Sequence, residues 1–208
     1  MTQMLRVSDA AALAVAAATR IALAAQEAIA TRGRFVFSLA GGSTPKATYR
    51  VLASLPGVDW TRVLLIFGDE RCVPPDFPAS NYHMVTESLL AQLQTKPRVL
   101  RMSGENPDPA WAAADYEANL RGTLGEDATV DLALLGLGDD GHTASLFPGR
   151  EALWEQQAWC VDTLAPDNET ARLTLTVPFL RRSRALLFLA SGETKAHILP
   201  AVLEDRPD

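Results

Sequence analysis

Four polar clusters in this sequence could do chemistry, and each directly follows a short apolar run. They read Gly41-Gly42-Ser43-Thr44-Pro45, Asp69-Glu70-Arg71, Gly136-Leu137-Gly138-Asp139-Asp140-Gly141-His142 and Ser191-Gly192-Glu193-Thr194-Lys195. Together they offer backbone donors, carboxylates, cations and a histidine. In an open parallel sheet, ligands bind outside the carboxyl ends of the strands. If the apolar runs are parallel strands, the four clusters meet at one edge of one sheet.

The first cluster has the composition of an anion-binding loop. Its two glycines let the backbone approach a ligand closely, and Thr44 as N-cap with Pro45 at the first helical position predicts the start of a helix. The free N–H groups of that helix, with the hydroxyls of Ser43 and Thr44, would face a phosphate. The same residues also suit a plain helix cap, so the cluster alone leaves both interpretations open.

The third cluster contains the histidine best placed for catalysis. The chain has three histidines, and His83 and His197 fall within predicted helices, where a surface or packing role is expected. His142 lies on a loop after a strand. The ordinary pKa of histidine, about 6.5, suits proton transfer at neutral pH. Asp139 and Asp140 could orient its ring and raise its basicity.

Other chemistries fit the spacings less well. Residues 136–141 form a literal G-x-G-x-x-G after a strand, but Asp139 and Asp140 would repel the pyrophosphate of a dinucleotide. The sequence has no G-x-S-x-G nucleophile elbow and no H-E-x-x-H or cysteine–histidine metal spacing. Those two aspartates, with Asp69 and His142, could in principle bind a metal ion, but we expect none.

The elements that must position these clusters are short strands alternating with helices. Apolar runs predict strands at 34–40, 63–67, 99–102, 132–135 and 185–190, with weaker candidates at 159–161 and 172–176. Helical patterns run from caps at Ser8 or Asp9 to about 30, and over 44–52, 80–93, 108–122 and 193–203. This alternation is typical of an α/β fold: a mainly parallel open sheet with helices on both faces, Rossmann-like in outline.

Composition narrows the classes of partner and compartment. The chain has 208 residues, a net charge of −6 and 48% apolar residues, which predicts one globular domain over 1–208. Its acidity disfavours nucleic acids and anionic membranes as partners. Cys72 and Cys160 are expected to be free thiols. The apolar run 10–19 resembles a signal peptide, but Arg20 interrupts it and the helical pattern continues, so we expect a cytoplasmic protein.

Three longer segments resemble 6-phosphogluconolactonases, members of the glucosamine-6-phosphate isomerase/6-phosphogluconolactonase superfamily. They are Ser38-Leu-Ala-Gly-Gly-Ser-Thr-Pro45, Phe67-Gly-Asp-Glu-Arg-Cys-Val-Pro74 with Ser80-Asn81-Tyr82, and Gly136-Leu-Gly-Asp-Asp-Gly-His-Thr-Ala-Ser-Leu-Phe-Pro148. The run 172–176 and Gly192-Glu-Thr-Lys195 continue the resemblance in the same order. It covers nearly the whole chain and implies the fold of glucosamine-6-phosphate deaminase.

The resemblance implies hydrolysis of 6-phospho-D-glucono-1,5-lactone to 6-phosphogluconate in the oxidative pentose phosphate pathway, with no metal or organic cofactor. It implies that His142 is the general base acting on water, that Asp69 and Arg71 line the lactone end, and that Arg71 stabilises the oxyanion. It assigns the substrate phosphate to Gly42, Ser43, Thr44, Arg172 and Lys195. The implied partner is a small phosphosugar lactone, and we expect a monomer or a weak homodimer.

Two alternatives to a lactonase stay open. In glucosamine-6-phosphate deaminases the histidine motif reads Gly-His-Ile-Ala-Phe-Asn-Glu-Pro, and its catalytic Glu falls on Phe147 here, which cannot transfer a proton. A non-catalytic phosphosugar-binding module would leave His142 without a role. The lactonases also usually continue past the position of Lys195 through another strand and a closing helix. We therefore expect the C-terminus, at Asp208, to be short and the last sheet edge to be affected.

Overall fold

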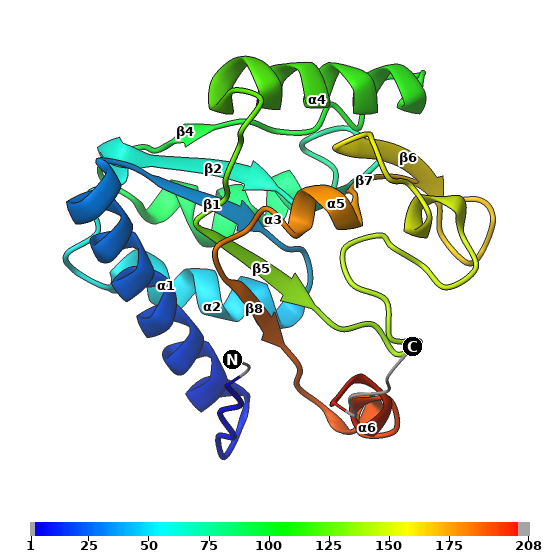
Figure 1. Cartoon of the computed structure of the whole chain (residues 1–208). Helices are drawn as coiled ribbons and strands as arrows, with labels where there is room; N and C mark the ends of the chain where they lie inside the picture. The colour runs from blue at the N-terminus through cyan, green and yellow to red at the C-terminus, as the bar shows by residue number, and fades with distance from the viewer. Residues whose placement is uncertain (1–2, 204–208) are drawn as a thin grey trace.

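The centre of the fold is a parallel sheet of five strands (Figure 1). The computed structural model describes residues 3–203. The strands are β1 (Phe35–Leu39), β2 (Val63–Phe67), β4 (Arg98–Val99), β5 (Leu132–Gly136) and β8 (Leu186–Leu189), in the order β4-β2-β1-β5-β8. Every residue of β1 and β2 is buried, as expected of parallel strands covered on both faces. The predicted α/β class is confirmed.

Helices cover this sheet on two sides. The longer ones are α1 (Ala10–Arg32), α2 (Ser43–Ser54), α3 (Asn81–Ser88) and α4 (Pro109–Leu124), and two short helices, α5 (Val177–Leu180) and α6 (Leu199–Leu203), come later in the chain. Helices α1 and α2 pack against each other, while α4 lies across the sheet from them (Figure 1). Asp9 caps α1 by accepting from the Ala12 N–H, and Gly33 ends it with a left-handed φ of 78°. Both predicted ends of this helix are confirmed.

Helix α1 is long and apolar enough, by length and composition, to cross a membrane. Its apolar face has a use within the fold. The helix packs on α2 and β1, and most of its buried residues join the hydrophobic core; these are Ala17, Ala18, Ile21, Ala22, Ala25 and Ala28. The run 10–19 is therefore part of a core helix, as its continuing pattern predicted.

A second, antiparallel sheet stands apart from the first. It consists of β3 (Asp69–Arg71), β7 (Ala171–Leu175) and β6 (Cys160–Leu164), in the order β3-β7-β6. The weaker strand candidates at 159–161 and 172–176 are confirmed as the strands β6 and β7. They belong to this second sheet and not to the parallel one. Strand β3 was not among the predicted strands, because its three polar residues carry no apolar pattern and pair with β7 only in the folded chain.

Helix α2 begins earlier than predicted. Its N-cap is Gly42, with a φ of 104° and no side-chain cap, and Ser43 is its first residue. The prediction that Thr44 is the N-cap is therefore wrong. Pro45 is tolerated in this first turn because the first four N–H groups of a helix have no partner within the helix.

Two other helices are shorter than predicted. The helix over 80–93 is α3 followed by a 3₁₀ turn at Leu90–Gln92, with a break at Leu89. The helix over 193–203 is a 3₁₀ turn at Glu193–Lys195 and the separate α6. Pro200 lacks the N–H that a continuous helix would need there. The remaining 3₁₀ turns are Trp60–Arg62 and Glu151–Leu153.

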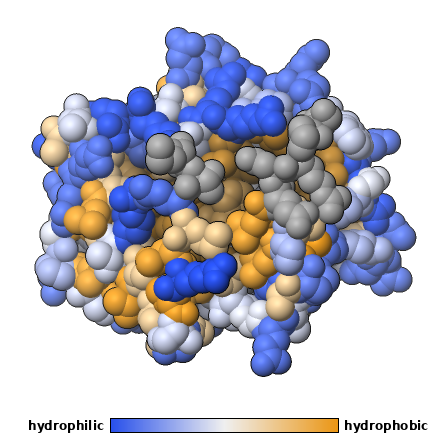
Figure 2. All heavy atoms as spheres, turned by 60° about the horizontal axis from the view of Figure 1, so that its bottom comes forward, coloured by the Kyte–Doolittle hydropathy of each residue, from blue (hydrophilic) through white to orange (hydrophobic). Residues whose placement is uncertain are grey.

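Strand β8 differs from the buried strands β1 and β2. Two of its side chains, Leu186 and Phe188, are 44% and 51% exposed. The strand is the last of the five in the described part of the sheet, so it has a neighbouring strand on one side. Apolar side chains also gather on the face of the molecule that Figure 2 brings forward. The edge of the sheet at β8 is thus less covered than its centre.

Candidate active site

The parallel sheet brings the four polar clusters to one edge. Strands β2, β1, β5 and β8 are consecutive and parallel, so their carboxyl ends point the same way. Each predicted cluster follows one of these ends. The juxtaposition expected from the sequence is confirmed. The separate roles of the residues depend on finer contacts, which differ from cluster to cluster.

The side chain of His142 is oriented by its own loop. Its Nδ1 lies 2.5 Å from Oδ1 of Asp140, and the same oxygen accepts from the His142 N–H at 3.1 Å. Partial burial acts to raise the pKa of Asp140, but the side-chain and backbone hydrogen bonds to His142 outweigh it and lower that pKa. A Cβ at Gly138 would lie 2.1 Å from Nδ1, so this glycine makes room for the ring.

An aromatic ring covers His142 on another side. The ring centroids of Phe147 and His142 are 4.5 Å apart and tilted by 55°, and Phe147 is buried. Phe147 is the position at which the deaminase motif has its catalytic Glu. The structure therefore gives His142 an apolar neighbour where that motif would supply a carboxylate.

Asp69 is a buried carboxylate that two distant segments hold. Its Oδ1 accepts from Nδ2 of Asn81 at 3.1 Å, and its Oδ2 accepts from the Ser145 hydroxyl at 2.8 Å. Nδ2 of Asn81 also donates to the backbone oxygen of Asp69 at 2.9 Å. Ser145 follows His142 by three residues. The Ser145 hydroxyl therefore ties the loop of His142 to strand β3.

Two arginines face each other across β3 and β7. Arg71 and Arg172 are register partners, and Arg71 Nη1 donates to the backbone oxygen of Ala79 at 2.6 Å. Both Nε atoms are buried and have no hydrogen-bond partner in residues 3–203. Burial, and next the charge of Arg71, lower the pKa of Arg172. Like charges placed directly opposite each other are unfavourable, so an anion bound between them would relieve a built-in repulsion.

The glycine-rich loop lies against the same network. A Cβ at Gly41 would come within 2.0 Å of Asn81 Oδ1, so this close approach requires glycine. Just before it, the buried Tyr49 hydroxyl donates to the Ala40 oxygen and accepts from the Ala40 N–H, both at 2.9 Å. The loop is therefore firmly held where it leads into the exposed Ser43 at the start of α2.

Lys195 lies beside the loop of His142. Its ammonium group pairs with the carboxylate of Asp139, and this bond lowers the pKa of Asp139. The family resemblance implies that Lys195 binds the substrate phosphate. A contact with phosphate would require the pair with Asp139 to open or to share the lysine.

Three residues of this network had no role in the sequence analysis: Glu70, Asn81 and Ser145. All are nearly fully buried. Asn81 follows Ser80, which was recognisable as a cap for a helix. Ser145 carried no signal of its own, because its partner Asp69 is 76 residues away.

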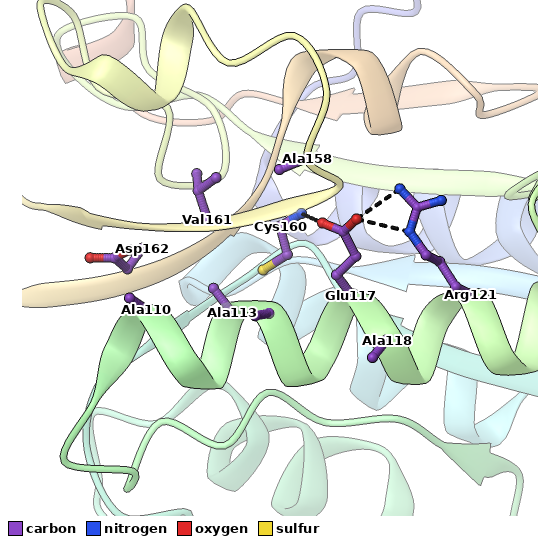
Figure 3. A pocket seen from close by; sticks show the side chains of 10 residues that line it. Ala110, Ala113, Glu117, Ala118, Arg121, Ala158, Cys160, Val161 and Asp162 are labelled. Atoms are coloured by element: carbon purple, nitrogen blue, oxygen red, sulfur yellow. Dashed lines mark hydrogen bonds and ion pairs between the residues drawn. The ribbon is translucent and has the colours of Figure 1, made fainter.

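Two further observations concern metal ions and a groove elsewhere on the surface. Residues 3–203 contain no group of three or more His, Cys, Asp or Glu side chains that could hold a metal ion. A groove of about 410 Å³ runs between α4 and β6, and none of the candidate residues lines it (Figure 3). Glu117 there accepts from Arg121 at 2.8 Å and from the Trp159 N–H at 2.7 Å, so its carboxylate is already satisfied.

The sheet and its polar edge define a class of protein: a Rossmann-like α/β fold with a histidine, cations and a helix start gathered at the carboxyl ends of its parallel strands. Residues 8–208 match the family described as glucosamine-6-phosphate isomerases/6-phosphogluconolactonase. The chain belongs to this family.

Relatives and solved structures agree with this assignment. The chain is 35% identical to a probable 6-phosphogluconolactonase of Schizosaccharomyces pombe, over 95% of this chain and 82% of that one. It is 37% identical to the 6-phosphogluconolactonase of Synechocystis, over 88% and 77%. The crystal structure of a 6-phosphogluconolactonase from Shewanella baltica superposes with a TM-score of 0.85 at 30% identity, covering 96% of this chain and 85% of that chain. A monomeric glucosamine-6-phosphate deaminase, 24% identical with a TM-score of 0.83, shares the fold.

Proposed function

We propose that this protein hydrolyses 6-phospho-D-glucono-1,5-lactone to 6-phosphogluconate, as the names of its relatives say of those proteins. The observation that carries the proposal is the His142–Asp140 pair, which faces the same sheet edge as the anion-binding loop and the two arginines. A lactone that bears a phosphate needs both a base and cations, and this edge offers both.

His142 acts as the general base. With Nδ1 donating to Asp140, Nε2 is free to take a proton from water. The hydroxide oxygen attacks C1 of the lactone and the carbonyl electrons move onto the exocyclic oxygen. When this intermediate collapses, the bond from C1 to the ring oxygen breaks, and His142 returns its proton to that oxygen. The water oxygen ends in the carboxyl group of 6-phosphogluconate.

Arg71 stabilises the oxyanion of the intermediate, and Asp69 lines the lactone end beside it. Charge stabilisation of this kind often contributes more to a rate enhancement than any other effect. Arg172 binds the phosphate together with Gly42, Ser43 and Thr44 at the start of α2, where free N–H groups and the helix dipole favour an anion. Lys195 joins them when its pair with Asp139 opens.

The proposal is tested by generating the lactone with glucose-6-phosphate dehydrogenase and following its disappearance. We expect a rate far above that of spontaneous hydrolysis. Loss of the lactone at the spontaneous rate, with the protein folded, would contradict the proposal.

The same preparation separates the alternatives. A deaminase would consume glucosamine-6-phosphate, but Phe147 beside His142 argues against it. A non-catalytic module would bind 6-phosphogluconate without accelerating hydrolysis. We further propose that the enzyme works in the cytoplasm as one domain, in the oxidative pentose phosphate pathway.

A further inference from the structure

Glu70 is a buried carboxylate that the proposed reaction does not use. It is 2% exposed and lies on β3 between Asp69 and Arg71. Successive side chains of a strand point to opposite faces. Asp69 and Arg71 therefore share one face, and Glu70 points to the other, toward the start of α3.

The oxygens of Glu70 accept four hydrogen bonds. Oε1 accepts from the backbone N–H groups of Arg71 and Asn81, both at 2.7 Å, and Oε2 accepts from the Ser80 hydroxyl at 3.0 Å and the Tyr82 N–H at 2.8 Å. Asn81 and Tyr82 open α3, so their N–H groups have no partner within the helix. The carboxylate occupies the positive end of that helix.

Donors contact both side-chain oxygens of Glu70. Burial raises the pKa of Glu70, and the four hydrogen bonds oppose that rise. Backbone N–H groups, which can only donate, contact both oxygens, so an amide nitrogen in place of either oxygen would face at least one of them. No Lys or Arg within residues 3–203 forms an ion pair with Glu70. Without an ion pair, the buried carboxylate depends on these four hydrogen bonds to offset the cost of burial.

The structure shows what Glu70 holds in place. It fixes the N–H of Arg71 directly. It also fixes the backbone of Asn81, whose side chain holds both the carboxylate and the backbone oxygen of Asp69 and lies against Gly41. One carboxylate thus links β3, the start of α3 and the glycine-rich loop.

We propose that Glu70 is a positioning residue for the lactonase reaction, acting through Arg71 and Asp69; this inference rests on the proposed function. Catalysis is sensitive to displacements of about 1 Å, which can cost about a hundredfold in rate. Glu70→Gln keeps the size of the side chain and introduces a donor among donors. We expect kcat per folded molecule to fall roughly tenfold to a hundredfold, with KM changed by less than about threefold.

The matched control is Asp108→Ala. Asp108 caps α4 by accepting from the Trp111 N–H and makes no hydrogen bond to β3 within residues 3–203, so its loss weakens a helix start outside the polar network. We expect both variants to lower Tm by a few degrees and only Glu70→Gln to lower kcat. Equal kcat values for Glu70→Gln and the wild type would overturn the inference, as would a rise in KM with kcat intact.

A double-mutant cycle separates positioning from general destabilisation. If Glu70 acts through Arg71 as well as Asp69, then Glu70→Gln costs less activity in the Arg71→Ala background than in the wild type, whereas fully additive losses contradict the inference. If Glu70→Gln does not fold, Ser80→Ala takes its place; it removes one donor to Glu70 together with the N-cap bond that the Ser80 hydroxyl accepts from the His83 N–H. We then expect a kcat loss of about two- to fivefold, and an unchanged kcat overturns the inference. An inactive wild-type protein would instead defeat the proposed function itself.

Discussion

Two regions supply the candidate catalytic groups, and they are built differently. The histidine loop, residues 136–142, orients His142 with bonds made inside the loop itself, and Asp140 and His142 are partly open to solvent. Strand β3 buries Asp69 and holds it with Asn81 and Ser145, from two other parts of the chain. The geometry of the histidine loop therefore depends on neighbouring residues, whereas the geometry of β3 depends on residues from distant parts of the chain.

This difference predicts different responses to mutation. A change in the histidine loop removes chemistry and leaves the fold intact, because the side chains lost are partly exposed and bond mainly to each other. A change at β3 alters stability and catalysis together, because the same hydrogen bonds hold the fold and the site. Five variants test this contrast, beginning with the largest expected effect.

His142→Ala should lower kcat by about 10²–10⁴-fold, the usual contribution of a general base. We expect Tm to stay within a few degrees of the wild-type value, since the His142 side chain is 29% exposed and is not part of the core. Steady-state kinetics and thermal melting check both expectations. A raised KM with kcat intact would make His142 a binding residue.

Asp69→Asn should damage both properties. The amide can keep its oxygen toward Asn81 only by turning its nitrogen to Ser145, whose hydroxyl must then accept. Both bonds change from charge-assisted to neutral, which costs about 1 kcal/mol each in the free energy of unfolding. We expect kcat to fall about tenfold or more as the lactone end of the site shifts. Urea unfolding and kinetics measure the two losses. A loss of kcat without a loss of stability would contradict this expectation. It would show that β3, like the histidine loop, can lose a catalytic side chain without weakening the fold.

Asp140→Asn should lower kcat by about tenfold to a hundredfold, because the ring of His142 loses the carboxylate that selects its tautomer. The pKa of Asp140 is lowered in the folded protein, so its contribution to stability is complete above the ordinary Asp pKa of about 3.9 and is lost as the pH falls through the folded value. The stability difference from wild type should therefore shrink in acid. A difference that is constant with pH would show that the pair does not stabilise the charged carboxylate.

Arg172→Ala should weaken 6-phosphogluconate binding by about tenfold, since charge-assisted bonds to phosphate are strong. Its loss also removes the repulsion with Arg71, so the free energy of unfolding should change little or rise. Calorimetric titration and melting check the two effects. Unchanged affinity would remove Arg172 from the phosphate site.

Ser145→Ala should have the smallest effect. It deletes one hydrogen bond to Asp69 and leaves the other oxygen of that carboxylate with Asn81. We expect a loss of about 1 kcal/mol in the free energy of unfolding and a drop in kcat of severalfold at most. The matched control is Thr143→Ser, two residues before Ser145. This variant keeps the hydroxyl bond to the backbone oxygen of Gly136.

The sequence was informative where structure depends on short-range pattern. Continuous apolar runs predicted the strands β1, β2, β5 and β8, and the clusters that follow them predicted the edge at which they meet. Local predictions also failed: the N-cap of α2 is Gly42, and the helices expected over 80–93 and 193–203 are each interrupted. The assignments of individual residues to substrate groups stay predictions until the variants are measured.

What the sequence by itself determined is the α/β fold, the polar edge and the histidine loop, because each follows from the spacing of neighbouring residues. Only the tertiary structure decided that Asp69 would be held between Asn81 and Ser145, that Arg71 would face Arg172, and that Glu70 would cap α3. These contacts join segments that lie far apart in the chain or on separate elements. They form because burying a polar side chain is favourable only where the fold supplies its partners, and no pattern of neighbouring residues records where those partners will be.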